Sequence, residues 1–260
     1  MKEHQNLFSL KNKVAVVIGG SGVLGGEMAL ALAGAGAKTA IFYSGNVEGA
    51  EEQKAAIEKE GGTAKICQAD VRDHSSLQMA FQKVIDRWER IDILVNAPGV
   101  NSTTPVMEIT DEEWDLIMDV NLKGVFLASR IAAKIMIESR TAGSIINISS
   151  ASSEIPLSEV FTYSISKAGV NNMTKFLARE WSPHNIRVNA ILPGFFPAEQ
   201  NREILTDERI EAIFNHTPMK RFGEPSELSG ALLWLASNEA SSFVTGAIVP
   251  VDGGFTAMTI

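Results

Sequence analysis

Short apolar runs alternate with longer segments of helical periodicity along most of the chain. Val14–Ile18 is an uninterrupted apolar run, which is typical of a strand buried on both faces. A glycine-rich stretch follows, and apolar residues then recur at helical spacing from Gly22 to Gly34. Strands joined by helices of this length pair in parallel with right-handed crossovers. The pattern therefore predicts a parallel sheet covered by helices on both faces.

The same alternation continues to the end of the chain. Further strands are predicted at 39–43, 64–69, 91–95, 144–148, 186–192 and 247–251, and further helices at 48–60, 75–88, 111–137 and 161–181. Thr110 and the acidic residues after it are suited to the N-terminus of the long helix. We expect a single α/β domain of Rossmann type over residues 1–260, with a doubly wound seven-stranded parallel sheet. Residues 195–219 interrupt the alternation and are predicted to form a lid or substrate loop.

Composition narrows the range of partners. The 260 residues are 45% hydrophobic and carry a formal net charge of −8. We therefore expect small-molecule ligands and no binding to nucleic acid. Cys67 is the only cysteine and no Cys/His group has ligand spacing, so we expect neither a disulfide nor a metal site. Residues 1–10 lack the apolar core of a signal peptide, and no stretch approaches the roughly 18 apolar residues of a membrane span. A cytoplasmic protein without membrane association is expected.

A glycine-rich turn joins the first predicted strand to the first predicted helix. It reads Gly19-Gly20-Ser21-Gly22-Val23-Leu24-Gly25-Gly26. Ligands of open parallel sheets bind beyond the carboxyl ends of the strands, and the N–H groups and dipole of a helix N-terminus attract phosphate. The sequence favours a dinucleotide site here over a turn that merely needs positive φ.

The second predicted strand ends without the acid that often binds the adenosine ribose of NAD. It ends at Tyr43-Ser44-Gly45-Asn46, which weakly favours NADP over NAD, although Tyr43 and Ser44 would equally suit the lining of an adenine pocket. Asp70, just past the third strand, is suited either to bind the adenine amino group or to cap a turn with Arg72.

Tyr163 and Lys167 are four residues apart and therefore share one face of a predicted helix. A carbonyl that receives hydride needs a proton donor, and a phenol serves if its pKa is lowered toward the working pH. A neighbouring ammonium and a positive cofactor ring favour the phenolate, so we expect Lys167 to lower the pKa of Tyr163.

Two further polar residues fit the same chemistry. Ser150 follows the fifth strand, where its hydroxyl is expected to reach the reacting oxygen, although a strand-end cap is an equal alternative. Asn121 is a polar residue in an apolar helical stretch, so its amide needs partners. A water bridge to Lys167 would satisfy it, and a place at a helix kink is the alternative.

From Lys13 to Phe255 the chain resembles a one-domain short-chain dehydrogenase/reductase. The landmarks in family order are the glycine turn, Asp70-Val71, Asn96-Ala97-Pro98-Gly99, Asn121, Ser150, Tyr163 with Lys167, Val188-Asn189-Ala190, Pro193-Gly194 and Val251-Asp252-Gly253-Gly254. The resemblance implies a hydride transfer between NADP or NAD and an alcohol or carbonyl group.

The resemblance also implies residue roles. Asn121, Ser150, Tyr163 and Lys167 would be the catalytic tetrad, with Asn96 and Val188 flanking the cofactor. The expected cofactor-binding residues are Gly19, Ser21, Gly22, Val23, Leu24, Tyr43, Ser44, Asn46, Asp70, Val71, Asn96, Ala97, Pro98, Tyr163, Lys167, Pro193, Gly194 and Phe196. Three positions depart from the family pattern: Ile18 and Ala198 stand where threonine is usual, and Val23 stands where glycine is usual. These departures are expected to affect cofactor affinity. Pro98 replaces the usual alanine and is expected to stiffen a turn.

Within the family, the segments Gly22-Val23-Leu24-Gly25, Pro193-Gly194-Phe195-Phe196 and His216-Thr217-Pro218-Met219 look like the mannonate oxidoreductase branch. A sugar acid needs a cation and several hydrogen-bonding groups, which Gln200, Asn201 and Arg202 would supply together with Ser152. The alternative is that Glu199–Arg202 cap the next helix. The segment between Gly99 and Trp114 is shorter than the corresponding segment of that branch. Because this loop is expected to border the substrate cavity, the substrate can differ from that of the branch.

Two other functions compete with this interpretation. One is a 3-oxoacyl-[acyl-carrier-protein] reductase, which would want a basic patch for an acidic carrier protein. The other is a sensor that binds dinucleotide without turnover, against which the complete tetrad argues. The resemblance further implies a homodimer or homotetramer, with Met258, Thr259 and Ile260 buried between dimers.

Overall fold

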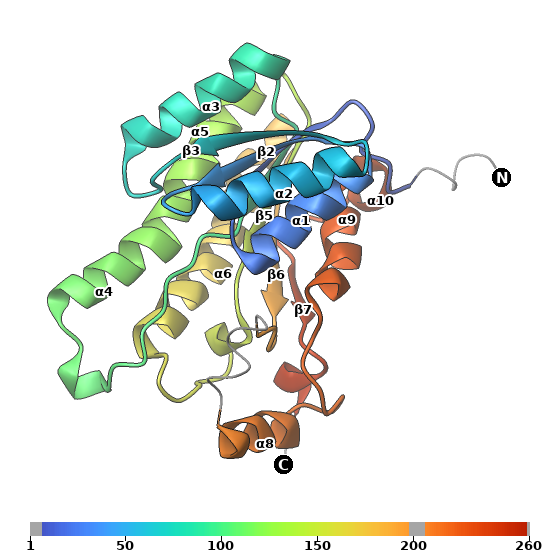
Figure 1. Cartoon of the computed structure of the whole chain (residues 1–260). Helices are drawn as coiled ribbons and strands as arrows, with labels where there is room; N and C mark the ends of the chain where they lie inside the picture. The colour runs from blue at the N-terminus through green and yellow to red at the C-terminus, as the bar shows by residue number, and fades with distance from the viewer. Residues whose placement is uncertain (1–6, 198–205, 259–260) are drawn as a thin grey trace.

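The computed structural model describes residues 7–197 and 206–258 and contains a parallel sheet of seven strands (Figure 1). The strands are β1 (Val14–Ile18), β2 (Lys38–Tyr43), β3 (Thr63–Gln68), β4 (Ile93–Asn96), β5 (Gly143–Ile148), β6 (Ile186–Pro193) and β7 (Ile248–Val251). Their order is β3-β2-β1-β4-β5-β6-β7. The predicted doubly wound seven-stranded sheet is confirmed, and each predicted strand has a counterpart.

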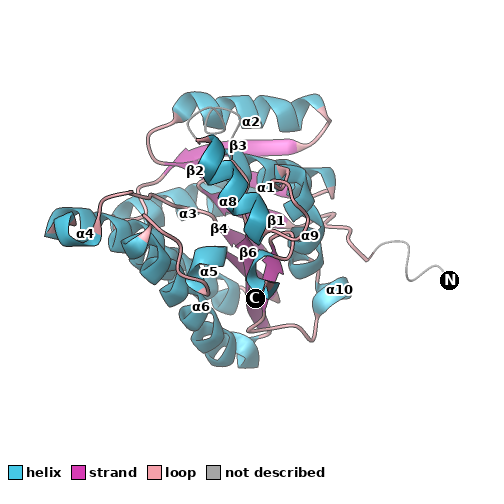
Figure 2. Ribbon diagram, turned by 90° about the horizontal axis from the view of Figure 1, so that it is seen from below, coloured by secondary structure: helices cyan, strands magenta, loops and turns pink. Residues whose placement is uncertain are grey.

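Helices cover both faces of the sheet (Figures 1 and 2). They are α1 (Val23–Gly34), α2 (Val47–Lys59), α3 (His74–Trp88), α4 (Asp111–Met118), α5 (Gly124–Glu138), α6 (Phe161–Trp181), α8 (Asp207–His216), α9 (Ser229–Ala236) and α10 (Asn238–Ser241). Helices α1, α2 and α9 pack on one face, and α3, α5 and α6 on the other. Within the described ranges, no helix combines the length and apolarity needed to cross a membrane.

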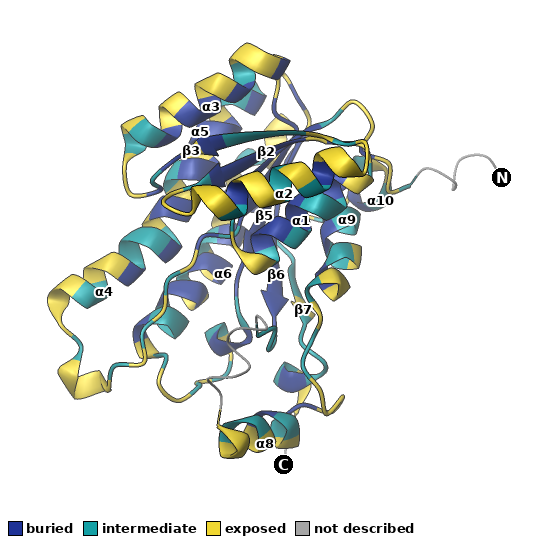
Figure 3. Cartoon of the chain, in the orientation of Figure 1, coloured by how far each residue is buried: buried dark blue, intermediate teal, exposed yellow. Residues whose placement is uncertain are grey.

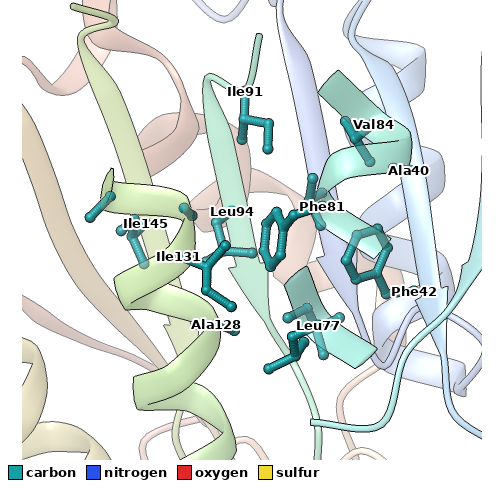
Figure 4. Close-up of a cluster of buried hydrophobic side chains, with 14 of the residues drawn as sticks. Ala40, Phe42, Leu77, Phe81, Val84, Ile91, Leu94, Ala128, Ile131 and Ile145 are labelled. Carbon is teal, nitrogen blue, oxygen red and sulfur yellow. The ribbon is translucent and has the colours of Figure 1, made fainter. Parts of the chain in front are cut away.

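Each central strand contributes to two hydrophobic cores because its side chains alternate between the faces. Val14 and Val16 belong to the core under α3 and α5, whereas Ala15 and Val17 belong to the core under α1. Figure 4 shows part of the first core, where the ring of Phe81 on α3 meets that of Phe42 on β2 edge-on at 5.2 Å. Figure 3 shows that the central strands are buried while the outer sides of the helices are exposed. The apolar runs of these central strands are therefore enclosed on both faces.

The predicted helical segment 111–137 is confirmed, because residues 111–138 are helical without a break. A π-helical turn, Asp119–Lys123, lies between α4 and α5. Such a turn accommodates one extra residue and is frequent at functional sites. Asn121 lies in this turn, which agrees with the kink alternative for that residue. The expected N-cap is confirmed, because the Thr110 hydroxyl accepts a hydrogen bond from the backbone N–H of Glu113.

The interruption at 195–219 contains a helix that the periodicity did not predict. Helix α8 lies beyond the carboxyl end of β6 (Figure 1) and begins after Thr206, whose side chain accepts from the Arg209 N–H. Phe214 on α8 packs against Phe222 at 4.8 Å between ring centres. Helices α9 and α10 were also missed, since α9 is apolar on most sides and shows little periodicity.

The amino ends of β1 and β4 are joined by a buried carboxylate. Asp92 accepts two hydrogen bonds from Arg90, at 2.6 and 2.8 Å, and one from the backbone N–H of Val14 at 3.0 Å. The ammonium of Lys13 lies 3.5 Å from the same side chain. This cluster stabilises the end of the sheet at which the strands begin, opposite their carboxyl ends.

Candidate active site

A hollow of about 640 Å³ lies at the carboxyl ends of β1, β4, β5 and β6. In the strand order, β1 and β4 are neighbours, and the chain leaves them toward opposite faces of the sheet. The two connections diverge and open a crevice at this point, which is the usual ligand site of such a sheet.

Most of the glycine-turn and tetrad residues line this hollow. From the predicted site they are Gly19, Gly22, Val23, Leu24, Ala97, Pro98, Ser150, Ser152, Tyr163, Lys167, Pro193, Gly194 and Phe196. Residues far apart in the sequence, such as Gly19 and Gly194, are therefore brought together.

The glycine turn is shaped to let a ligand approach the backbone. Gly19 has φ of +73°, and a Cβ at Gly25 would lie 2.2 Å from the Gly19 carbonyl oxygen, so helix α1 packs against the turn only without side chains. The N-cap of α1 is Gly22, which supplies no side-chain cap, and the first turn of α1 contains no acid. The backbone N–H groups at the start of α1 therefore face the hollow without a competing side-chain acceptor, as an anion site requires.

Tyr163 and Lys167 both extend from the first turns of α6 into the hollow. The Lys167 Nζ atom is 5.6 Å from the centre of the Tyr163 ring, so the predicted shared face is confirmed. The same ammonium donates to the Ile148 carbonyl at 2.9 Å and to the Pro98 carbonyl at 3.4 Å. These bonds fix Lys167 between the ends of β5 and β4.

Burial controls both pKa values. It lowers the pKa of Lys167 to about 8, because the ammonium is only 3% exposed and loses its hydration. It raises the pKa of Tyr163, and a hydrogen bond from Ser150 opposes this rise. The expected lowering of the Tyr163 pKa by Lys167 is therefore wrong for the chain alone, since desolvation of the phenolate outweighs the stabilising contacts.

Ser150 has the capping role considered for it, because its side chain caps the short helix Ala151–Ser153 by accepting from the Ser152 N–H at 3.2 Å. Its side chain also lowers the pKa of the Tyr163 phenol, and the expected bond to the reacting oxygen stays a prediction. Ser152, expected to contact substrate, lines the hollow, but its hydroxyl donates to Ser150 Oγ at 3.0 Å.

Asn121 is fully buried and its amide is bound directly by protein groups. Its Oδ1 accepts from the Val100 N–H at 2.9 Å, and its Nδ2 donates to the Val100 carbonyl at 2.9 Å and to Ser166 Oγ at 3.1 Å. The Ser166 hydroxyl in turn donates to the Tyr163 carbonyl at 2.6 Å. Asn121 thus holds the Val100 loop, which lines the hollow, against α6, and the water bridge expected to satisfy its amide is not needed.

Several expected cofactor residues lie outside the hollow lining. The Asn46 side chain caps α2 through the Gly49 N–H and donates to the Ser21 carbonyl at 3.3 Å, so it supports the glycine turn. Tyr43 and Ser44 end β2 beside it. Asp70 accepts from Arg72 Nη2 at 2.7 Å, which lowers the pKa of the carboxyl and agrees with the turn-capping alternative. Val71 is buried against Gly124.

Asn96 and Val188, expected to flank the cofactor, are fully buried within the sheet, and their place beside a cofactor stays a prediction. Asn96 Nδ2 donates to Ser129 Oγ and to Asn147 Oδ1, and Asn147 Nδ2 donates to Thr174 Oγ1. This buried polar network joins β4, β5, α5 and α6 and was not predicted. The sequence signal for it was an asparagine at matching positions of two apolar strands.

The predicted substrate residues Gln200, Asn201 and Arg202, as well as Ala198 and Glu199, lie outside the described residues. On α8, Arg209 donates to the hydroxyl and carbonyl of Ser158. Arg209 also lines a smaller pocket of about 240 Å³, which shares Leu157 and Phe195 with the hollow. A guanidinium is therefore held in a pocket adjacent to the hollow. Thr259 and Ile260 are likewise not described, and Met258 is 37% exposed.

Comparisons with known proteins agree with this geometry. A family model described as enoyl-(acyl carrier protein) reductase matches residues 21–256. The uncharacterized oxidoreductase UxuB of Bacillus subtilis (strain 168) is 39% identical over 98% of this chain and 97% of its own length. A 3-oxoacyl-[acyl-carrier-protein] reductase of Synechocystis sp. is 34% identical over 95% of this chain and 98% of its own length.

Solved structures match over a similar share of the chain. A gluconate 5-dehydrogenase from Burkholderia cenocepacia J2315, in complex with NADP and tartrate, has a TM-score of 0.91 at 33% identity and covers 98% of this chain and 99% of its own. A candidate D-mannonate oxidoreductase from Haemophilus influenza, with bound NAD, has a TM-score of 0.91 at 33% identity and covers 96% and 97%. Since these matches extend along almost the whole chain, it belongs to the short-chain dehydrogenase/reductase family of oxidoreductases.

Proposed function

We propose that this oxidoreductase interconverts a secondary alcohol and its ketone with NADP or NAD as the hydride carrier. The observation that carries the proposal is that Tyr163, Lys167 and Ser150 line the same hollow as the uncapped N-terminus of α1. An anion site and a proton-transfer site are thus adjacent, as a dinucleotide and its substrate require.

The residues present fit a dinucleotide. The glycine turn lets the backbone approach a pyrophosphate, and the α1 N–H groups attract it. Ala97, Pro98, Pro193, Gly194 and Phe196 would border the rest of the cofactor, and Tyr43, Ser44, Asn46 and Asp70 would approach its adenosine end. The relatives contain NADP in one case and NAD in another. The absence of an acid from Tyr43 to Asn46 supports NADP.

Bound NADPH or NADH supplies the hydride, and the protein handles the proton. In the reducing direction, the Tyr163 hydroxyl donates its proton to the carbonyl oxygen as hydride reaches the carbon, and a new C–H and a new O–H bond form. Ser150 donates a hydrogen bond to the same oxygen as its negative charge develops. In the oxidising direction, the Tyr163 phenolate accepts the alcohol proton.

Lys167 and Asn121 support this transfer without exchanging a proton with the substrate. The Lys167 ammonium lies beside the phenol and is placed to bind the nicotinamide ribose. Its positive charge, with that of the oxidised nicotinamide ring, would counter the effect of burial on the Tyr163 pKa. Asn121 keeps the Val100 loop and α6 in register.

The proposed substrate is a sugar acid, converted between aldonate and keto-aldonate. Two of the matched structures are named for gluconate and mannonate oxidation, and Arg209 supplies a cation beside the hollow for a carboxylate. The second candidate is a 3-oxoacyl-[acyl-carrier-protein] reductase, which the Synechocystis relative favours. The net charge of −8 opposes docking of an acidic carrier protein and supports the sugar acid.

We also propose that the chain forms a homodimer, or a homotetramer built from dimers. Support comes from an apolar groove of about 540 Å³ between α5 and α6, which includes the exposed rings of Phe126 and Phe176. Large exposed apolar patches of this kind mark interaction surfaces.

The decisive experiment is a panel of aldonates, keto-aldonates and a 3-oxoacyl thioester with each cofactor, read by the absorbance of reduced nicotinamide. Tyr163→Phe is expected to lose about 100-fold or more of the turnover while it retains cofactor binding. Unchanged turnover in this variant contradicts the mechanism. Cofactor binding without turnover of any alcohol or ketone would favour a sensor.

A further inference from the structure

Both acceptor sites of the Ser150 hydroxyl are used by one neighbour. The backbone N–H of Ser152 donates to Ser150 Oγ at 3.2 Å, and the Ser152 hydroxyl donates to the same oxygen at 3.0 Å. A serine oxygen accepts two hydrogen bonds and carries one proton. Ser150 therefore interacts with any further group as a donor.

The group that receives this proton lies in the hollow. Ser150 and Tyr163 both line it, and the Ser150 side chain lowers the pKa of the phenol against the effect of burial, as a donor to the phenolate does. Ser152 donates to Ser150, which leaves the Ser150 proton to be donated toward the phenol oxygen. Successive hydrogen bonds polarise one another, so the bond from Ser152 makes Ser150 a stronger donor.

The neighbouring serine takes no part in these hydrogen bonds. Ser153 donates to the Ser150 backbone carbonyl at 2.6 Å and accepts from Asn171 at 2.8 Å. Its hydroxyl therefore supports the short helix rather than the Ser150 hydroxyl. Ser152 is 4% exposed, so little water competes for its bond to Ser150.

We propose that Ser152 is a positioning residue, which holds the Ser150 hydroxyl as an obligate donor, to the Tyr163 phenolate in the free protein and to the reacting oxygen once substrate is bound. This proposal rests on the proposed function and adds a residue that acts through Ser150. It replaces the expected contact between Ser152 and a substrate hydroxyl.

The chain allows a direct test, because it contains only two tyrosines. In a Tyr43→Phe background, Tyr163 is the only phenol, and its ionisation is followed by the near-ultraviolet absorbance of phenolate without any substrate. Ser152→Ala is expected to raise the titration midpoint of Tyr163 by about 0.3 pH unit, because Ser150 then stabilises the phenolate less. An unchanged or lower midpoint overturns the proposal.

Two further variants separate the hydroxyl from its surroundings. Ser152→Thr keeps a hydroxyl and is expected to restore the midpoint, so a threonine variant that behaves like alanine contradicts the proposal. Ser153→Ala removes a hydroxyl from the same short helix without touching Ser150 Oγ, and it is expected to leave the midpoint in place. An equal shift in Ser153→Ala would mean that the helix, not the directed bond, sets the midpoint.

Kinetics with the substrate that the panel identifies give a second measurement. Ser152→Ala is expected to lower kcat about threefold with little change in KM, and to move the pH profile in the same direction as the titration. A rise in KM alone would indicate a substrate contact and overturn the proposal. Since the phenol titration needs no turnover, failure of the sugar-acid assignment would leave its result intact.

Discussion

Replacement of Asn121 by alanine tests whether this residue holds the hollow together. The substitution removes three hydrogen bonds, two with the backbone of Val100 and one with Ser166. A hydrogen bond contributes about 1 kcal/mol on average, and more where the abandoned partner stays buried. Val100 is half-buried, so water replaces part of the loss. We expect the free energy of unfolding to fall by about 2 to 3 kcal/mol.

The assay is urea unfolding followed by circular dichroism, with kcat and KM measured beside it. Asn121→Asp separates the contacts, because it keeps the acceptor for the Val100 N–H but removes both donors. Asn101→Ala is the control for stability, since the Asn101 side chain bonds only the next backbone N–H among the described contacts, and its effect is expected within about 0.5 kcal/mol. A loss below about 0.5 kcal/mol in Asn121→Ala would refute the reasoning.

Three other predictions follow from the same contacts. Because burial lowers the pKa of Lys167 to about 8, the unfolded chain binds the extra proton above this pH, so the wild-type protein should gain stability relative to Lys167→Met between about pH 8 and pH 10. Urea unfolding across that range checks the sign, and a constant difference would contradict it. Arg209→Ala is expected to raise KM for a carboxylate substrate about tenfold and to leave an uncharged alcohol unaffected, whereas equal effects on both would exclude a carboxylate contact. Asp92→Asn weakens the bonds to Arg90 and is expected to cost about 2 kcal/mol of stability without changing KM, and a KM change would contradict its purely structural place.

Much of the fold follows from local patterns. The strand Val14–Ile18 is apolar without a break, and α6 has the predicted bounds Phe161–Trp181. Tyr163 and Lys167 share a face because helical spacing fixes it. These features depend on neighbours within a few residues, which the sequence displays directly.

The features that were missed depend on distant parts of the chain. Asn121 lies in the π-helical turn Asp119–Lys123 and contacts the Val100 backbone, and nothing in the local apolar pattern records that contact. The pKa of Tyr163 was predicted to fall, but the extent of burial appears only after strands and helices pack. The hydrogen bond from Asn46 to the Ser21 carbonyl depends on where the end of β2 lies relative to the glycine turn.

The strand order divides the hollow between an early and a late part of the chain. The side formed by β1 and α1 belongs to the first 34 residues, whereas the proton-handling groups all come after residue 120. We therefore expect coenzyme preference, which the proposal assigns to Tyr43–Asn46, to be adjustable separately from substrate preference. A graft of the first two strand–helix units from a relative is expected to exchange one dinucleotide for the other and to leave the proton-transfer groups in place.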